Sequence, residues 1–478
     1  MNQMKNIKQM NIMNQKNNVN PMNNMNPMNN MNPINNMNPM NNINQMNNII
    51  NMNNINLMNN MKQMIMMNQM NMNLMNNNNF NINQNNNNFK IGNFNMPTND
   101  NENNNNLKNE IISLFKNIKE NEYLFPLVGL NNVGLTCYMN STLQCLLHIP
   151  ELNNFFIKIY PINKEVYQSV NKEAETKGTL SNVYYQLVKD VEEKNKESKR
   201  FFFNNFYDKS VSPKKFNTIL SNLNPQFAQF ESNDAKDLLL YLFQSMHEEL
   251  NHFGDKKLNK VPKCDQTKEI ESYRFFEQVN VNLNLSIFSY LFYGILKSIT
   301  HCSKCGSDLF NFQYFQFLSF PLYNFRNKKF NIYKGLKEFI QVEKMTGDNK
   351  CYCQKCRNLC DADVSSKIYY PPPYLIINFD YGKDKKYKPY SIDFGQIIDL
   401  TDFTDPVCKE KAYELVAVST HLGKSGNSGH YISYCKNPFN QWHLFNDSSV
   451  SECNFDYVKK NSPYLLIFKK ISNENYNT

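Results

Sequence analysis

A loop leads into a helix in the segment Gly129-Leu-Asn-Asn-Val-Gly-Leu-Thr-Cys-Tyr-Met-Asn-Ser-Thr-Leu-Gln144. Glycines mark the loop, and apolar residues recur at helical spacing from Tyr138 until Pro150. Cys137 is therefore predicted to lie at a helix N-terminus, where the partial positive charge of the terminal N–H groups favours a thiolate over a thiol. A buried structural cysteine would give the same local pattern, so the assignment of a nucleophile depends on its partners.

The N-terminal part of the chain differs in composition from the rest. Residues 1–106 are dominated by Asn and Met, and a short repeat with prolines at Pro21, Pro27, Pro33 and Pro39 runs through residues 20–40. The low aliphatic and aromatic density of this tract cannot offset the entropy lost on ordering, so we expect it to be disordered. Asn-richness leaves self-association open beside the simpler reading of a neutral tail.

Charge and hydropathy argue against several classes of partner. The formal charge is +9 without a dense basic stripe, so we expect no nucleic-acid partner. No apolar run reaches the roughly 18 residues of a membrane span, and the N-terminus has no apolar signal-peptide core. We therefore expect no membrane contact and a cytoplasmic or nuclear location. In such a compartment the 12 cysteines should be reduced, metal-bound or catalytic.

Helices and strands can be assigned along the rest of the chain. Residues 107–125 are predicted to form an amphipathic helix. A second helix is predicted at residues 235–250, capped by Ser232 or Asn233, with Asp234 in its first turn either complementing the helix dipole or binding substrate. Aromatic and β-branched runs predict strands of a largely antiparallel sheet. These runs are residues 287–292, 310–320 and 369–379.

Two cysteine pairs interrupt the predicted sheet. They are Cys302-Ser-Lys-Cys305 and Cys353-Gln-Lys-Cys356. A two-residue spacer lets both sulfurs of a tight turn meet one tetrahedral ion, so two such pairs predict a structural zinc site, the alternative being four free thiols. Cys351 and Cys360 lie near the second pair, but an alternating strand through Tyr352 and Cys353 favours the pair itself as ligands.

A histidine with a neighbouring polar partner follows near the C-terminus. Residues 413–421 alternate like a strand, residues 421–429 are expected to form a flexible loop, and His430 begins a second strand. A four-residue turn at 437–440 would place residue 430 opposite residue 447, so His430 is expected near Asn446 or Asp447. Together with Cys137, this arrangement fits a nucleophile, a base and an orienting group.

These segments resemble the ubiquitin-specific proteases, a papain-like family of deubiquitinating enzymes. The resemblance covers residues 127–470 and rests on the cysteine segment together with five further motifs. They are Asn233-Asp-Ala-Lys-Asp237, Tyr293-Gly-Ile-Leu296, Tyr370-Pro-Pro-Pro-Tyr-Leu-Ile-Ile377, Gly429-His-Tyr431 and Trp442-His-Leu-Phe-Asn-Asp447. The resemblance implies an α+β fold with a helical thumb at residues 127–275, and with a β-rich palm and zinc-ribbon fingers at residues 276–472.

The resemblance also implies roles for individual residues. Cys137 falls on the nucleophile, His430 on the base and Asn446 on the third triad position. Asn132 falls on the oxyanion-stabilising asparagine, and Asp447 on a second polar residue beside the triad.

Further expectations follow from the same resemblance. Asp234 and Tyr431 are expected to contact substrate. Leu135 occupies a position where the family often has a second asparagine. Because simple strand pairing favours Asp447 as the neighbour of His430, the choice of Asn446 requires a bulge that rotates the strand end by one residue.

The resemblance therefore implies a cysteine isopeptidase that cleaves after the C-terminal Gly-Gly of ubiquitin on ubiquitinated proteins, and we expect the chain to be a monomer. Three alternatives stay open: a protease for another ubiquitin-like modifier, a catalytically inactive ubiquitin-binding scaffold, and an assembly protein whose main function lies in the Asn-rich tail. All three triad positions carry competent residues, which disfavours the scaffold.

Overall fold

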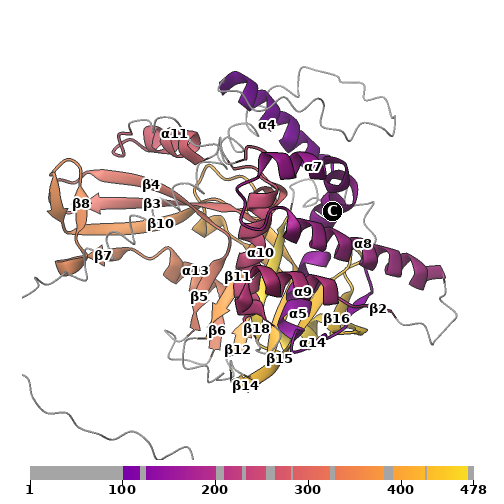
Figure 1. The fold of residues 1–478 in the computed structure, drawn as a ribbon. Coiled ribbons are helices and arrows are strands. Elements are labelled where there is room, and N and C mark those ends of the chain that lie inside the picture. Colours follow the sequence, from indigo (N-terminus) through magenta and orange to yellow (C-terminus); the bar gives the residue numbers. More distant parts are fainter. Residues whose placement is uncertain are drawn as a thin grey trace, which may run out of the picture. The chain divides into compact units, whose positions relative to one another are not determined.

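A large mixed sheet made mostly of C-terminal strands forms the centre of the folded part (Figure 1). Its strand order is β17-β16-β15-β14-β18-β11-β5, with β13 also paired to β14. The strands are β5 (Leu318–Pro321), β11 (Tyr374–Asp380), β13 (Ile397–Asp399), β14 (Ala412–Ser425), β15 (Ser428–Lys436), β16 (Trp442–Asn446), β17 (Ser449–Cys453) and β18 (Pro463–Lys470). All pairs in this sheet are antiparallel except β11 with β5.

A second sheet, of order β4-β3-β10-β7, is also antiparallel. Its strands are β3 (Gly294–Cys302), β4 (Asp308–Phe315), β7 (Glu343–Met345) and β10 (Ala362–Tyr370). A small hairpin of β8 (Cys351–Cys353) and β9 (Asn358–Cys360) lies at the far end of these strands from α5 (Figure 1). Two short parallel pairs complete the strands, β1 (Gly129–Leu130) with β2 (Ser210–Val211) and β6 (Lys329–Asn331) with β12 (Ser391–Asp393).

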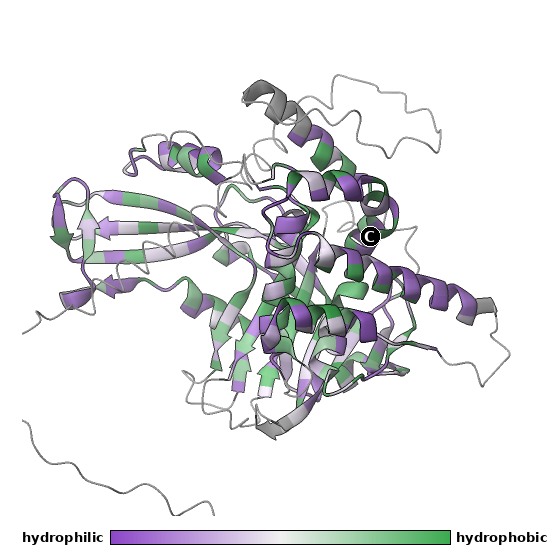
Figure 2. Ribbon diagram, viewed as in Figure 1, coloured by the Kyte–Doolittle hydropathy of each residue, from purple (hydrophilic) through white to green (hydrophobic). Residues whose placement is uncertain are grey.

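Helices make up most of the described residues before β3. They are α4 (Asn101–Lys116), α5 (Cys137–Leu147), α6 (Pro150–Asn154), α7 (Tyr160–Val170), α8 (Thr179–Arg200), α9 (Lys214–Leu223), α10 (Ala235–Glu249), α11 (Glu269–Asn280) and α12 (Ile287–Phe292), with α13 (Ile332–Phe339) and α14 (Phe455–Lys459) later. Figure 2 shows that α8 is largely hydrophilic, whereas the strands of the large sheet are rich in apolar residues. No helix in the described ranges is long and apolar enough to span a bilayer.

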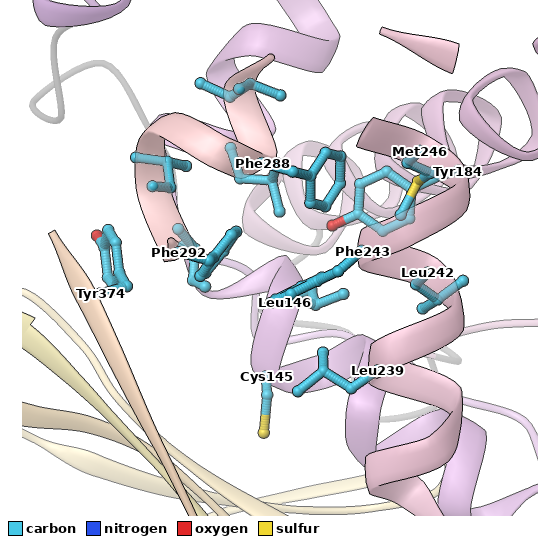
Figure 3. Close-up of a cluster of buried hydrophobic side chains, with 14 of the residues drawn as sticks. Cys145, Leu146, Tyr184, Leu239, Leu242, Phe243, Met246, Phe288, Phe292 and Tyr374 are labelled. Atoms are coloured by element: carbon cyan, nitrogen blue, oxygen red, sulfur yellow. The ribbon is translucent and has the colours of Figure 1, made fainter. Parts of the chain in front are cut away.

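The helices before β3 share one core with the large sheet, whereas α13 and α14 pack in a second core. Side chains of α5, α8, α10, α12 and β11 meet in this core, as shown by Leu146, Tyr184, Phe243, Phe292 and Tyr374 in Figure 3. The rings of Phe243 and Phe292 stack with their centroids 4.4 Å apart. Burying aromatic side chains of this size contributes about 1.5–3 kcal/mol each, so α5 is held in a rigid setting.

The computed structural model describes residues 101–118, 125–200, 209–228, 233–254, 264–280, 284–322, 329–381, 391–425 and 428–471, all within the compact unit of residues 50–478. The disorder predicted for residues 1–106 stays a prediction for residues 1–100, which lie outside these ranges, whereas residues 101–106 belong to helix α4. Helix α4 begins at Asn101 and ends at Lys116, so the predicted helix at 107–125 was placed too late. Ile111, Ile112 and Phe115 are buried, as their helical spacing suggests.

Four other predicted elements differ from the structure. The run 310–320 is split between β4, which ends at Phe315, and β5, which begins at Leu318 in the other sheet. Residues 287–292 form helix α12 and not a strand, because Ser286 and Ser289 make a reciprocal capping box that nucleates a helical turn. The run 369–379 is split between β10 and β11 by three consecutive prolines, which cannot donate ladder hydrogen bonds. Much of the loop expected at 421–429 instead extends the β14–β15 hairpin.

Candidate active site and metal site

Cys137 is the first residue of α5, as its sequence setting predicts. Its side chain is only 7% exposed. Burial raises the pKa of the thiol and the charge of Asp447 acts in the same direction, while backbone N–H groups, chiefly that of Tyr431, oppose both effects. The predicted acidification by the helix N-terminus is therefore not the dominant effect, because desolvation penalises the thiolate more strongly.

Helix α5 is fastened to β15, the strand that carries His430. The Ser141 hydroxyl donates to the carbonyl of Ile432 at 3.0 Å and lies 2.7 Å from the Ser419 hydroxyl. Further along, the Cys435 thiol lies 3.8 Å from the carbonyl oxygen of Gln144. Because the Tyr431 N–H also faces the Cys137 sulfur, the start of α5 lies next to the start of β15.

His430 is paired with Asn446. The Nε2 atom of His430 lies 2.6 Å from Oδ1 of Asn446, whereas the nearest carboxylate oxygen of Asp447 is 4.0 Å away. An amide oxygen can only accept, so the imidazole proton is on Nε2 and Nδ1 is left as the basic nitrogen. This geometry is that of a histidine oriented by an asparagine.

The strand register explains why Asn446 faces the histidine. Lys436 pairs with Trp442 and Ser433 with Phe445, so continuing the ladder places Asn446 opposite Ile432. His430 then shares a face with Asn446 as its diagonal neighbour. The predicted register, with residue 430 opposite residue 447, was wrong by one residue, and no bulge is needed in β16.

The turn between β15 and β16 is the cause of this shift. The N–H of Asn437 donates to the carbonyl of Gln441 at 2.9 Å, so the connecting loop is residues 438–440 and not the predicted 437–440. Asn440 has a φ of 63°, the left-handed conformation that closes three-residue hairpin loops. An asparagine at this position was the available signal, because Asn tolerates φ > 0 better than most residues.

Asp447 connects three segments and does not orient the imidazole. Its Oδ1 accepts from the Asn140 amide at 2.8 Å, its Oδ2 accepts from the Asn132 amide at 3.0 Å, and its carbonyl accepts from the Leu130 N–H at 2.9 Å. Nothing in the sequence pattern singled out Asn140, although its position three residues after Cys137 places it on the same helix. Asp447 thus ties the cysteine loop, helix α5 and β1 to the end of β16.

The loop before Cys137 is organised by Asn132. Its Oδ1 accepts from the N–H groups of Gly134 and Thr136, each at 3.2 Å, and from the Thr136 hydroxyl. Its amide nitrogen carries two hydrogens, and the bond to Asp447 uses one of them. Gly134 has a φ of 124° and Leu135 a φ of 49°, so two left-handed residues precede the cysteine by a few positions.

The two residues expected to contact substrate, Asp234 and Tyr431, both lie against Tyr464. Asp234 caps α10 through a 2.7 Å bond from the Lys236 N–H, so neither Ser232 nor Asn233 is the cap. Its other oxygen accepts from the Tyr464 hydroxyl. The ring of Tyr431 lies 5.6 Å from that of Tyr464. Nothing in the sequence pattern singled out Tyr464.

Four cysteine sulfurs converge at the far end of β3. They belong to Cys302, Cys305, Cys353 and Cys356, and they all lie within 4.8 Å of one another. The Cys302–Cys356 and Cys305–Cys353 sulfur distances are 4.0 and 3.6 Å. Tetrahedral coordination with Zn–S bonds of about 2.3 Å requires sulfurs about 3.8 Å apart, so this donor set fits a zinc ion.

Comparison with known proteins places this arrangement in a family. Residues 128–468 match the family described as "Ubiquitin carboxyl-terminal hydrolase". Ubiquitin carboxyl-terminal hydrolase 2 of Bos taurus is 26% identical over 352 residues, which are 72% of this chain and 55% of the relative. The Gallus gallus hydrolase 2 is 27% identical over 72% of this chain and 94% of the relative. The chain thus spans about half of the Bos taurus relative and nearly all of the Gallus gallus relative.

Solved structures share the fold. A SAGA DUB module bound to monoubiquitin superposes with a TM-score of 0.51 at 21% identity, covering 77% of this chain and 75% of that chain. The same module bound to ubiquitin aldehyde gives a TM-score of 0.50 at 21% identity, covering 77% and 76%. This likeness confirms the predicted α+β fold.

Proposed function

The chain belongs to the ubiquitin carboxyl-terminal hydrolase family, and on that premise we propose that it is a deubiquitinating cysteine isopeptidase, with ubiquitin and ubiquitinated proteins as its partners. The observation that carries the proposal is the 2.6 Å contact between His430 and Asn446. His430 lies on β15, and β15 is hydrogen-bonded to α5, the helix that begins with Cys137. A nucleophile, a base and an orienter are then on adjoining elements.

The proposed reaction uses these residues in order. Nδ1 of His430 takes the proton of the Cys137 thiol, and the thiolate attacks the carbonyl carbon of the terminal ubiquitin glycine. The imidazolium then returns a proton to the departing lysine amine, leaving a thioester that water hydrolyses. Asn446 holds the ring in the tautomer that leaves Nδ1 basic.

We assign stabilisation of the oxyanion to Asn132 and to backbone N–H groups at the start of α5. The second amide hydrogen of Asn132 is the donor, and Asp447 holds that amide in place through the first. A raised thiol pKa suits this scheme, because the proton leaves Cys137 only when His430 is aligned to take it.

Asp234 and Tyr431 are proposed to contact the ubiquitin tail. Tyr431 follows His430 directly, and the pair formed by Asp234 and Tyr464 lies beside it. We also propose that the four-cysteine cluster holds one structural zinc ion. The metal would fasten the turn after β3 to the β8–β9 hairpin and would take no part in the reaction at Cys137.

The decisive experiment is hydrolysis of a ubiquitin–fluorophore conjugate by the purified full-length chain. We expect release of the fluorophore, and covalent labelling of Cys137 by a ubiquitin–propargyl probe. Cys137→Ser should abolish both and still bind ubiquitin, whereas Cys145→Ser, on the same buried helix, should retain both. Labelling of Cys145 or Cys435 would overturn the assignment of the nucleophile.

The open alternatives give different outcomes in the same assay. Binding of ubiquitin without turnover by the unaltered chain would identify an inactive scaffold. Turnover confined to a conjugate of another ubiquitin-like modifier would identify that modifier as the substrate. Neither binding nor turnover of any conjugate would leave assembly through the tail as the main function.

A further inference from the structure

A fifth thiol lies against the four-cysteine cluster. Cys360, the last residue of β9, is 5% exposed and packs in one buried cluster with Cys302 and Cys353, with Cys305 and Cys356 against it. Cys356, which supplies one of the four converging sulfurs, packs against this cluster. Cys360 is therefore close to the four-cysteine cluster in space and not only in sequence.

Two backbone connections hold Cys360 at the cluster. The N–H of Ser303, in the turn that carries the first cysteine pair, donates to the carbonyl of Asp361 at 2.9 Å. One residue later, Ala362 pairs with Cys302 across β10 and β3. The chain leaving β9 is thus fastened to the first cysteine turn on the residues directly after Cys360.

The hairpin places Cys356 and Cys360 in different settings. Cys356 lies in the turn between β8 and β9, next to Arg357, which has a left-handed φ of 53°. Cys360 lies on the strand, directly opposite Cys351. The thiol of Cys360 makes a long contact of 3.6 Å to the carbonyl of Asn358. A thiol is a weak donor, so little is lost if this contact breaks.

We propose that Cys360 is a reserve metal ligand that takes the place of Cys356. In the exchange one metal–sulfur bond breaks at Cys356 and one forms at Cys360. The proton released by the Cys360 thiol is balanced by the proton that Cys356 takes up, so the site keeps four thiolates and the same charge. This inference rests on the proposed metal binding, and it assigns a role to a cysteine outside the two spaced pairs.

The test uses Co²⁺, whose visible absorption reports how many thiolates bind it, on full-length chains. Cys356→Ser should keep about one cobalt per chain and the four-thiolate spectrum. Cys356→Ser/Cys360→Ser should lose the fourth thiolate, with a weaker sulfur charge-transfer band and less metal retained after dialysis. Cys356→Ser/Cys351→Ser is the matched control, because Cys351 is the cross-strand neighbour of Cys360, and it should behave like Cys356→Ser.

Each outcome separates the two proposals. A three-thiolate spectrum for Cys356→Ser that is unchanged when Cys360 is also replaced would overturn the reserve ligand while leaving the metal site standing. Failure of the unaltered chain to bind either Co²⁺ or Zn²⁺ would contradict the metal site itself, and the reserve ligand with it.

Discussion

His430 and Asn446 stand on the same face of the β15–β16 hairpin, one step apart along the diagonal, with 2.6 Å between Nε2 and Oδ1. The neighbouring Asp447 has already committed both carboxylate oxygens, one to Asn132 and one to Asn140. The two adjacent polar residues therefore have different roles: Asn446 orients His430, and Asp447 holds the cysteine loop and helix α5 in place.

Replacing the two residues should separate these tasks. Asn446→Ala removes a hydrogen bond to a group that becomes charged, worth about 1.5–3 kcal/mol, and should lower kcat roughly ten- to hundredfold and move the pH at which the rate half-rises. Asp447→Ala should lower the melting temperature as well as the rate, because the cysteine loop and helix α5 lose the carboxylate that both Asn132 and Asn140 bind. Steady-state kinetics across pH and thermal unfolding measure both effects. A pH profile that Asn446→Ala leaves unmoved would refute this division.

The reactivity of Cys137 should depend on pH in a particular direction. Burial and Asp447 raise the pKa of its thiol, so the thiolate fraction is small at neutral pH and grows as pH rises. The rate of alkylation by iodoacetamide should therefore still be increasing at pH of about 8.5, where an ordinary thiol is half ionised. Asp447→Asn removes a negative charge and should move the profile toward lower pH. A rate that levels off below neutrality would restore the helix N-terminus as the dominant influence.

Leu135 is predicted to destabilise the chain slightly. Its φ of 49° costs a residue with a branched side chain about 1 kcal/mol relative to a residue that tolerates the left-handed region. Leu135→Asn should raise the free energy of unfolding by about that amount, as measured by urea denaturation. Leu359→Asn is the control, because Leu359 is equally exposed, at 56%, but lies on strand β9. Equal effects of the two substitutions would rule out relief of backbone strain.

Removal of the proposed zinc should act locally. A chelator should increase amide hydrogen exchange in β8, β9 and the cysteine ends of β3 and β10, while α5 and β15 keep their protection, since their contacts lie in a separate core. Cys302→Ser should reproduce this pattern without chelator. Cys264→Ser, which removes a cysteine outside the cluster, should not. Metal content near zero in a well-folded preparation would mean that the cysteines are free thiols.

Much of the site could be predicted from patterns within a few residues, whereas the rest depends on packing between segments far apart in the sequence. The start of α5 and the two cysteine pairs follow from spacing within a few residues, so they could be predicted. The thiol pKa of Cys137 could not, because it depends on β15 covering α5 from about 300 residues away. The role of Asp447 likewise needs Asn132 and Asn140 as partners.

The turn at residues 438–440 also shows where local reasoning failed. The turn is one residue shorter than predicted. Because side chains alternate between the two faces of a strand, the predicted register placed Asp447 beside His430, where the structure has Asn446. The strand predicted at residues 287–292 failed for a similar reason, since one pair of serines outweighed the β-propensity of the aromatic residues.

The same turn determines which side chains of β16 face His430. A change that moved the pairing of Asn437 with Gln441 by one residue would bring the opposite set of β16 side chains beneath His430, although no catalytic residue would have changed. Natural variation at this exposed tip, where Phe439 is 83% exposed, should therefore be tolerated wherever the pairing of Asn437 with Gln441 is kept.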